Sequence, residues 1–401
     1  MRILAIETSC DETALSLIEA SGTAQNPSFT ILENIVSSQV ALHAQYGGVF
    51  PMMAKREHAK NIGPILKKLI AREKLKSTDA NLKKRNALQK ILEREPELFT
   101  YFEKEILPLK KPKIDLIVVT RGPGLEPTLW VGINFARALA KLWDIPIVGA
   151  NHMEGHAISP LIATLALGKK SPLEKRITFP ALALLVSGGH TELVIMRDWA
   201  HYKIVGATRD DAAGEAFDKV ARMLALPYPD GPEISLLAAA SREKLIINNS
   251  KLKIKKENKI TFPRPMINSS DFDFSFSGLK TAVLYYIRDL KTKLTPTVKS
   301  AIAREFEDAV VDVLVGKTIR AAQKYKVRSV LVGGGVAGNT ELRARLAQTG
   351  AENKIPVFFS TRELATDNSV MIGMAGYFAY LKKGRADNPD KIKAEGNLKL
   401  N

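Results

Sequence analysis

The chain has 401 residues, of which 45% are hydrophobic and 25% are charged, and its net charge is +17. These proportions are typical of globular proteins and exclude wholesale disorder, and the length suffices for two or three domains with cores of their own. No stretch approaches the ~18 apolar residues that a membrane span needs, and the single cysteine, Cys10, excludes a disulfide framework. Because Glu7 interrupts the apolar opening where a signal peptide would continue, we expect a cytoplasmic protein.

The first half of the sequence alternates β-rich runs with polar turns and helical patterns. Three strands are predicted first, followed by a helix, a strand, a helix, a strand and a helix that opens near His152. The strands are Ile3–Glu7, Ala14–Glu19, Ile31–Ser37, Leu116–Thr120 and Ile147–Ala150, and the helices before His152 are His58–Lys74 and Leu129–Leu142.

A similar order recurs in the second half, where three strands are again followed by helices and a further strand. The strands are Ala181–Ser187, Glu192–Arg197, Lys203–Ala207 and Ser329–Val332, and the helices are Ala212–Leu224, Thr297–Tyr325 and one from Asn339. The doubled pattern predicts an α/β protein of two facing units, with a cleft lined by their hairpin turns.

Two charged stretches have the composition of insertions. Lys67–Lys113 is rich in Lys, Arg, Leu and Glu and predicts one or two solvated helices, and Arg242–Lys259 predicts a basic hairpin or loop. Together they hold most of the excess positive charge, which indicates a polyanionic partner. Each stretch is either a solvated surface or a contact for a phosphate backbone.

Two of the six histidines, His152 and His156, are four residues apart where a helix is expected to begin. This spacing places both imidazoles on one helix face, as a metal site requires, although two surface histidines would show the same spacing. A zinc protease needs Glu directly after the first His, and Met153 stands there, which argues against that class.

Three glycine-containing segments are candidates for binding a phosphate or a nucleoside. Val186–His190 lies at a turn between strands, and Gly333–Asn339 follows a strand and opens a helix, where backbone N–H groups can approach an anion. Tyr228–Pro232 has the composition of a turn. The glycine spacing of Gly333–Asn339 matches neither a Rossmann nor a Walker A motif. Any one of the three segments can also be a plain turn.

Four acidic side chains complete the candidate set. Asp11 and Glu12 lie in the first hairpin turn, and Asp218 lies on a predicted helix. Asp367 precedes a helix, where it would either cap that helix or serve as a third ligand beside the two histidines. A set of two histidines and one carboxylate leaves metal positions open for a substrate oxygen.

Six motifs, in order from Met1 to about Gly376, strongly resemble the TsaD (Gcp) family. They are Glu7–Thr13, His152–His156, Leu185–Thr191, Gly214–Lys219, Phe274–Lys280 and Gly333–Asn339. The resemblance implies an α/β fold of the actin/Hsp70/sugar-kinase-like (ASKHA) class, with two RNase H-like lobes around a central cleft. We expect an N-terminal lobe over 1–178, completed by 365–401, and a C-terminal lobe over 179–364. The basic insertions would lie at about 75–113 and 242–259.

Members of this family are tRNA N6-adenosine threonylcarbamoyltransferases, so the resemblance implies that the polyanion is tRNA. They transfer a threonylcarbamoyl group from threonylcarbamoyl-AMP to N6 of adenosine 37, giving t6A, in tRNAs that read codons beginning with A. Two alternatives stay open, because fold does not fix function. One is an ATPase or phosphotransferase of the same superfold, which would not need the histidine pair, and the other is a non-catalytic tRNA-binding scaffold.

The resemblance also assigns residues and partners. One divalent metal ion, Fe2+ with Zn2+ as the alternative, would be held by His152, His156 and Asp367. The threonylcarbamoyl-adenylate would be held by Leu185, Val186, Ser187, Gly188, Gly189, Asp218, Gly231 and Asn339. Asp11 or Glu12 would orient the metal's water shell or accept the amine proton. The expected partners are a TsaB-like paralogous subunit, a TsaE-like ATPase and a TsaC-like synthase that supplies the adenylate.

The sequence departs from the family's pattern at three positions. Asn151 replaces a frequent His before the metal motif, Met52 replaces a frequent Glu, and Asp230 replaces a frequent Gly. None of these changes removes a residue that the resemblance assigns to the metal or the adenylate.

Overall fold

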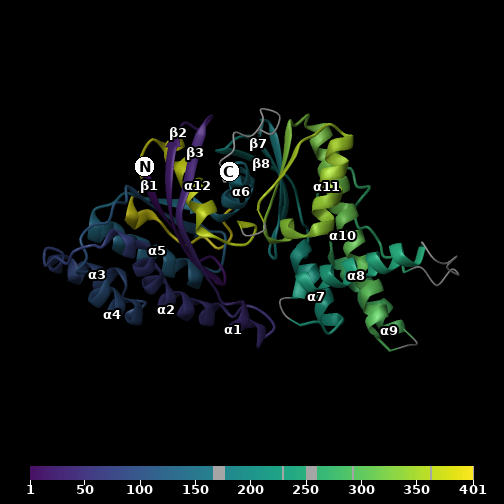
Figure 1. The fold of residues 1–401 in the computed structure, drawn as a ribbon, viewed down its shortest axis with the longest axis horizontal. Coiled ribbons are helices and arrows are strands. Elements are labelled where there is room, and N and C mark those ends of the chain that lie inside the picture. The colour runs from purple at the N-terminus through teal and green to yellow at the C-terminus, as the bar shows by residue number, and fades with distance from the viewer. Residues whose placement is uncertain (166–176, 228–229, 250–259, 291–292, 362–363, 401) are drawn as a thin grey trace. The chain divides into compact units, whose positions relative to one another are not determined.

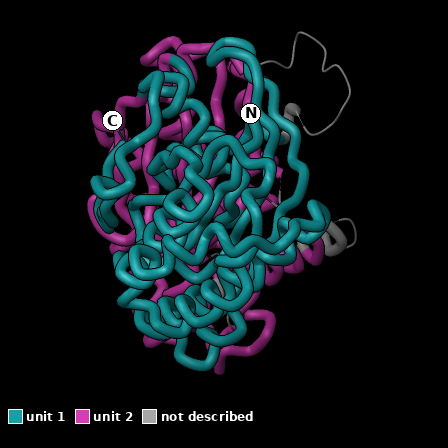
Figure 2. The backbone as a smooth tube through the Cα atoms, turned by 90° about the vertical axis from the view of Figure 1, so that its left-hand side faces the viewer, with its two compact units in different colours: residues 1–170, 198–201, 366–401 teal, residues 171–197, 202–365 magenta. Residues whose placement is uncertain are grey.

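The computed structural model describes residues 1–165, 177–227, 230–249, 260–290, 293–361 and 364–400. The chain divides into two compact units (Figure 2). Unit 1 consists of residues 1–170, 198–201 and 366–401, and unit 2 consists of residues 171–197 and 202–365. Each unit is built around one five-stranded sheet.

The sheet of unit 1 has the strand order β3-β2-β1-β4-β5. Its first three strands are antiparallel neighbours, and β1, β4 and β5 run parallel. The central strands are buried from end to end because helices cover both faces of the sheet, which explains their continuous apolar runs. The strands are β1 (Arg2–Glu7), β2 (Glu12–Gly22), β3 (Pro27–Ser38), β4 (Leu116–Gly122) and β5 (Ile147–Asn151).

Helices cover the sheet of unit 1 on both sides (Figure 1). On one side lie α2 (Pro51–Ile70) and α5 (Glu126–Trp143), with α3 (Arg85–Ile91) and α4 (Pro96–Glu105) outside them, and the short α1 (Val40–Ala44) precedes α2. On the other side lies α12 (Ser369–Lys383), which also packs on α6 (His152–Leu165). A Cβ atom on Gly376 would stand 2.2 Å from Val118, so glycine permits the close approach of α12 to β4.

Unit 2 repeats the arrangement, with the strand order β10-β9-β6-β7-β8. Counted within its unit, each sheet follows the order third, second, first, fourth and fifth strand, so the doubled pattern and the two-unit α/β architecture are confirmed. The strands are β6 (Ala181–Val186), β7 (Thr191–Asp198), β8 (His201–Ala207), β9 (Ser329–Gly333) and β10 (Val357–Phe359). The helices are α7 (Ala213–Met223), α8 (Asp230–Asn249), α9 (Ser277–Asp289), α10 (Pro296–Lys324) and α11 (Thr340–Glu352).

All the predicted strands and helices are present with shifted ends, but β10, α1, α8 and α9 were not predicted. β10 has three residues and α1 has five, which are too few to show a period. Among the described residues, no helix combines the length and the apolar character that a membrane span needs.

Three predictions about the charged and turn segments are corrected. Lys67–Lys113 is not a wholly solvated insertion, because α3 and α4 bury Leu88, Leu98 and Phe102 in the core of unit 1. Arg242–Asn249 belongs to α8 and is not a hairpin, and Ser250–Lys259 lies outside the described residues. Gly231 lies in the first turn of α8 and not in a free turn, because the helix begins at Asp230, while residues 228 and 229 lie outside the described part.

Candidate metal centre and glycine turns

Two histidines and one aspartate meet at the start of α6 in unit 1. One ligand atom from each of His152, His156 and Asp367 lies within 4.8 Å of the other two. The Nε2 atoms of His152 and His156 stand 3.3 Å and 3.2 Å from Oδ1 of Asp367. The sequence spacing therefore does place both imidazoles on one helix face, and the third predicted ligand reaches them from the segment before α12.

Asp367 is not the N-cap of α12. Asn368 fills that position, and its side chain accepts a hydrogen bond from the N–H of Met371 at 3.0 Å. The capping alternative for Asp367 is therefore wrong, and its carboxylate faces the histidines instead. Burial opposes ionisation, but the two imidazoles outweigh burial and lower the pKa of Asp367.

Glu7, at the end of β1, fixes the ring of His152. Its Oε2 atom lies 3.0 Å from Nδ1 of His152 and accepts a hydrogen bond from Oγ1 of Thr120 at 2.7 Å, while its Oε1 atom accepts from the N–H of Ser9. A carboxylate on Nδ1 holds the proton there and leaves Nε2 as a lone-pair donor, an arrangement common around metal-binding histidines. Burial works to lower the pKa of His152, but Asp367 and Glu7 outweigh it and raise that pKa well above its usual range.

His156 supplies the test of whether these residues fit a metal ion. Both of its ring nitrogens are buried, and neither makes a well-formed hydrogen bond within the described residues, although Nε2 faces the oxygen of Asp367. Burial lowers the pKa of His156, which favours the neutral ring that a metal requires. An unsatisfied buried imidazole beside a carboxylate and a second oriented imidazole is a donor set that fits a divalent cation.

Asn151 ties the start of α6 to the C-terminal segment. Its Oδ1 atom accepts hydrogen bonds from the N–H groups of Met153 and Glu154 at 2.8 Å and 3.4 Å, and its Nδ2 atom donates to the carbonyl of Lys399 at 3.1 Å. Asn151 therefore caps the helix that carries both histidines. Asn151, which stands where the family frequently has His, therefore has a structural role as the cap of this helix.

The hairpin turn with Asp11 and Glu12 also lies close to the candidate metal centre. Burial, with Asp367 and Asp11 nearby, raises the pKa of Glu12 to about 9. Oε1 of Glu12 accepts a hydrogen bond from Ser38 at 3.1 Å. The turn is held by the buried His58 of α2, which contacts Thr13 Oγ1 at 2.7 Å through Nδ1 and the carbonyl of Cys10 at 3.0 Å through Nε2.

In unit 2, two predicted glycine segments pack against one another. The turn after β6 offers open space at Gly188 and Gly189, since a Cβ atom on either would meet nothing within 4 Å. Gly334 has a positive φ of 93°, and a Cβ atom there would stand 2.3 Å from the carbonyl oxygen of Val186. The Gly333–Gly338 segment therefore lies directly on the end of β6, next to the open turn.

The remaining predicted adenylate residues fall into two pairs of contacts. Oδ1 of Asp218 on α7 accepts a hydrogen bond from the N–H of Gly231 at 3.1 Å. The side chain of Asn339 caps α11 by accepting from Leu342 at 2.8 Å, and its amide donates to Ser235 and Glu307 at 2.8 Å and 2.7 Å. Both amide hydrogens of Asn339 are therefore engaged within unit 2.

Several supporting residues were not predicted from the sequence. Glu7 belongs to the first motif and His58 to the predicted helix His58–Lys74, but their buried contacts join distant parts of the chain. Asp211 joins two motifs, because Lys219 and Lys280 both donate to it at 2.9 Å and 2.8 Å. An aspartate that precedes a helix, as Asp211 does, gives no sequence signal that it will bind lysines from two distant motifs.

The fold and site define an α/β protein of two units with doubled sheet topology, a two-histidine, one-carboxylate cluster in unit 1 and packed glycine turns in unit 2. The sequence model of one family, described as "TsaD: tRNA N6-adenosine threonylcarbamoyltransferase", matches residues 30–82 and 105–374. The chain belongs to this family, and it is a transferase that acts in tRNA modification.

Relatives from three organisms carry the name tRNA N6-adenosine threonylcarbamoyltransferase. The chain is 39% identical to that of Moorella thermoacetica (100% of this chain, 97% of the relative) and 39% identical to that of Staphylococcus haemolyticus (94% and 91%). It is 38% identical to that of Clostridium novyi (100% and 98%). A solved structure of full-length HypF aligns with 95% of this chain and 46% of its own, at a TM-score of 0.48 and 11% identity.

Proposed function

We propose that this chain transfers the threonylcarbamoyl group of threonylcarbamoyl-AMP to N6 of adenosine 37 in tRNAs that read codons beginning with A. The observation that carries the proposal is the convergence of His152, His156 and Asp367, with His152 oriented by Glu7 and His156 lacking a hydrogen-bond partner among the described residues. A sugar kinase or an actin-like ATPase has no use for such a centre, whereas acyl transfer does.

The three residues would hold one divalent ion, with Fe2+ as the first choice and Zn2+ as the second, because imidazole and carboxylate ligands suit both metals. Bound there, the ion would act as a Lewis acid on an oxygen of the substrate. Glu7 keeps His152 in the ligating tautomer, and Asn151 fixes the helix start that carries both imidazoles.

The reaction requires a positioned amine, an electrophilic carbonyl carbon and an acceptor for the amine proton. The mixed anhydride of the adenylate already provides a good leaving group, so positioning and charge stabilisation are the main tasks of the protein. We propose Asp11 or Glu12 as the proton acceptor, because both carboxyl groups lie in the hairpin turn close to the candidate metal centre.

Unit 2 would hold the adenylate through the turn Leu185, Val186, Ser187, Gly188 and Gly189, with Asp218 and Gly231 beside it. The open space at Gly188 and Gly189 supports this role, because a ligand can approach their backbone closely. Asn339 would contribute by holding the glycine segment in place, since its amide is engaged with Ser235 and Glu307.

The test is mass spectrometry of tRNA nucleosides after reconstitution with threonine, bicarbonate, ATP and tRNA. The proposed TsaB-like, TsaE-like and TsaC-like partners complete the mixture. The wild-type chain should produce t6A, and His152→Ala should lower its formation by at least about 100-fold, because a ligand is lost. His201→Ala is the matched control, since His201 is exposed and pairs only with Asp198 among the described residues. Undiminished t6A with His152→Ala would contradict the proposal.

A further inference from the structure

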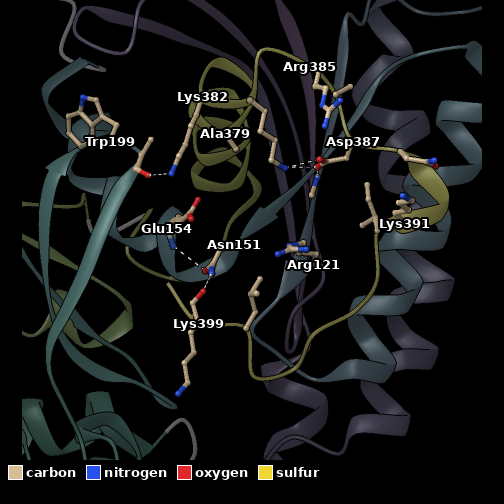
Figure 3. Close-up of a pocket in the computed structure, with 17 residues that line it drawn as sticks. Arg121, Asn151, Glu154, Trp199, Ala379, Lys382, Arg385, Asp387, Lys391 and Lys399 are labelled. Atoms are coloured by element: carbon tan, nitrogen blue, oxygen red, sulfur yellow. Dashed lines mark hydrogen bonds and ion pairs between the residues drawn. The ribbon is translucent and has the colours of Figure 1, made fainter. Parts of the chain in front are cut away.

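A basic cavity of about 960 Å3 lies in unit 1 beside the start of α6 (Figure 3). Asn151 and Glu154, which flank His152 in the sequence, both line it. Six cationic side chains from the end of β4, the end of α12 and the C-terminal segment line the space, together with two acidic side chains, one of them on α6. The cations are Arg121, Lys382, Lys383, Arg385, Lys391 and Lys399, and the acids are Glu154 and Asp387.

The fold explains only some of these cations. Lys382 and Lys383 lie in the last turn of α12, where positive charge interacts favourably with the helix dipole. Lys382 donates to the carbonyl of Ala200 at 2.7 Å, and Lys383 pairs with Asp387 at 2.7 Å. Arg121 pairs with Glu395 at 3.0 Å. Arg385 and Lys391 are exposed and form no ion pair with the described residues.

The two acids do not neutralise the cavity. Asp387 is already paired with Lys383, and its Oδ2 atom accepts a hydrogen bond from the N–H of Gly149 at 3.0 Å. Glu154 also lines the cavity, and it is one carboxyl group among six cationic side chains. Cations gathered from three segments around a space of this size leave a positive field that an anion would relieve.

We propose that this basic cavity binds backbone phosphates of the tRNA substrate. The proposal rests on the proposed function for the identity of that substrate. The cavity is much larger than one phosphate, and its cations are spread over separate segments, as a chain of phosphates requires. Because its wall includes the neighbours of His152, tRNA held here would lie beside the candidate metal centre.

The test compares direct tRNA binding by the purified chain, without any transfer reaction. The variant Arg385→Gln/Lys391→Gln removes two exposed cations, so it should keep its fold, which a thermal melt verifies. Binding of a tRNA transcript, followed by fluorescence anisotropy from 50 to 300 mM KCl, should weaken at least about tenfold at low salt. The slope of log K against log salt should fall by about two, since each lost phosphate contact contributes about one.

Arg328→Gln/Lys354→Gln is the matched control, because it also removes one arginine and one lysine from exposed positions, in unit 2. The control should bind tRNA nearly as the wild type does. Equal binding by wild type and the cavity variant would overturn the proposal, and so would an equal loss in variant and control, or no tRNA binding by the wild type. The two proposals can fail separately. If the cavity variant binds tRNA more weakly but His152→Ala still forms t6A at the wild-type level, the proposed function is wrong and the proposed tRNA contact stands.

Discussion

At the scale of single residues, the candidate site depends on buried side chains that the motifs do not explain by themselves. Glu7 accepts hydrogen bonds from Ser9 and Thr120 and faces Nδ1 of His152, so one carboxylate links β1, β4 and α6. His58 does the same for the first hairpin, since it contacts Thr13 and Cys10. Such residues fix the positions of the candidate metal ligand His152 and of the first hairpin.

His58 predicts a specific dependence of stability on pH. Burial lowers the pKa of His58 below its usual value of 6.5. In the pH interval just below 6.5, the unfolded chain therefore binds more protons than the folded chain, and the free energy of unfolding falls as the pH falls through this interval. The melting temperature should therefore drop between pH 7.5 and pH 5.5, and His58→Gln should show a smaller drop. At pH 7.5 this variant should lose about 1–3 kcal/mol, because buried hydrogen bonds are broken.

Thermal melts at the two pH values measure both effects. His201→Gln serves as the control, because this exposed histidine should leave the pH dependence unchanged. The same drop in His58→Gln as in the wild type would show that another group controls the acid sensitivity.

At the scale of elements, α3 and α4 change the meaning of the charged stretch between Lys67 and Lys113. The family's sequence model leaves residues 83–104 unmatched, yet this segment contributes Leu88, Leu98 and Phe102 to the core of unit 1. Phe102 is fully buried, and its ring packs edge-on against Phe135 of α5 at 6.0 Å. The segment is therefore a structural layer whose outer face alone is charged.

Phe102→Ala should lower the free energy of unfolding by about 3–5 kcal/mol, because it leaves a cavity in a close-packed core. We expect the melting temperature to fall by roughly 10 °C. Lys104→Ala, at an exposed position on the same helix, should change it little. If Phe102→Ala melted together with Lys104→Ala, the stretch would be a solvated insertion after all.

At the scale of the whole molecule, the order of strands along the chain and the cluster of His152, His156 and Asp367 could be predicted, but the contacts that join distant segments could not. Apolar, β-rich runs mark nine of the ten strands, and the spacing of His152 and His156 places both on one helix face. The contact of Glu7 with His152 joins residues 145 positions apart, and its contact with Thr120 spans 113 positions. Sequence periodicity reports local structure only, so such contacts become visible in the folded chain.

Part of the positive charge in the first charged stretch is paired in the folded chain. Within the stretch between Lys67 and Lys113, Lys84 is bound to Asp144 and to the carbonyl of Leu142, and Arg85 is paired with Glu103. Paired cations contribute less to a field that attracts tRNA. The cations around the cavity beside α6 include unpaired ones, which makes this part of unit 1 the stronger candidate among the described residues.

The central claim is that His152, His156 and Asp367 hold a divalent ion that t6A formation requires. The most direct measurement is t6A formation by chelator-treated enzyme in the complete reconstituted mixture, before and after the addition of stoichiometric Fe2+ or Zn2+. We predict that the metal-free enzyme forms little t6A, and that one equivalent of Fe2+ or Zn2+ restores it in the wild type but not in Asp367→Asn. Full t6A formation by the metal-free enzyme would contradict the account.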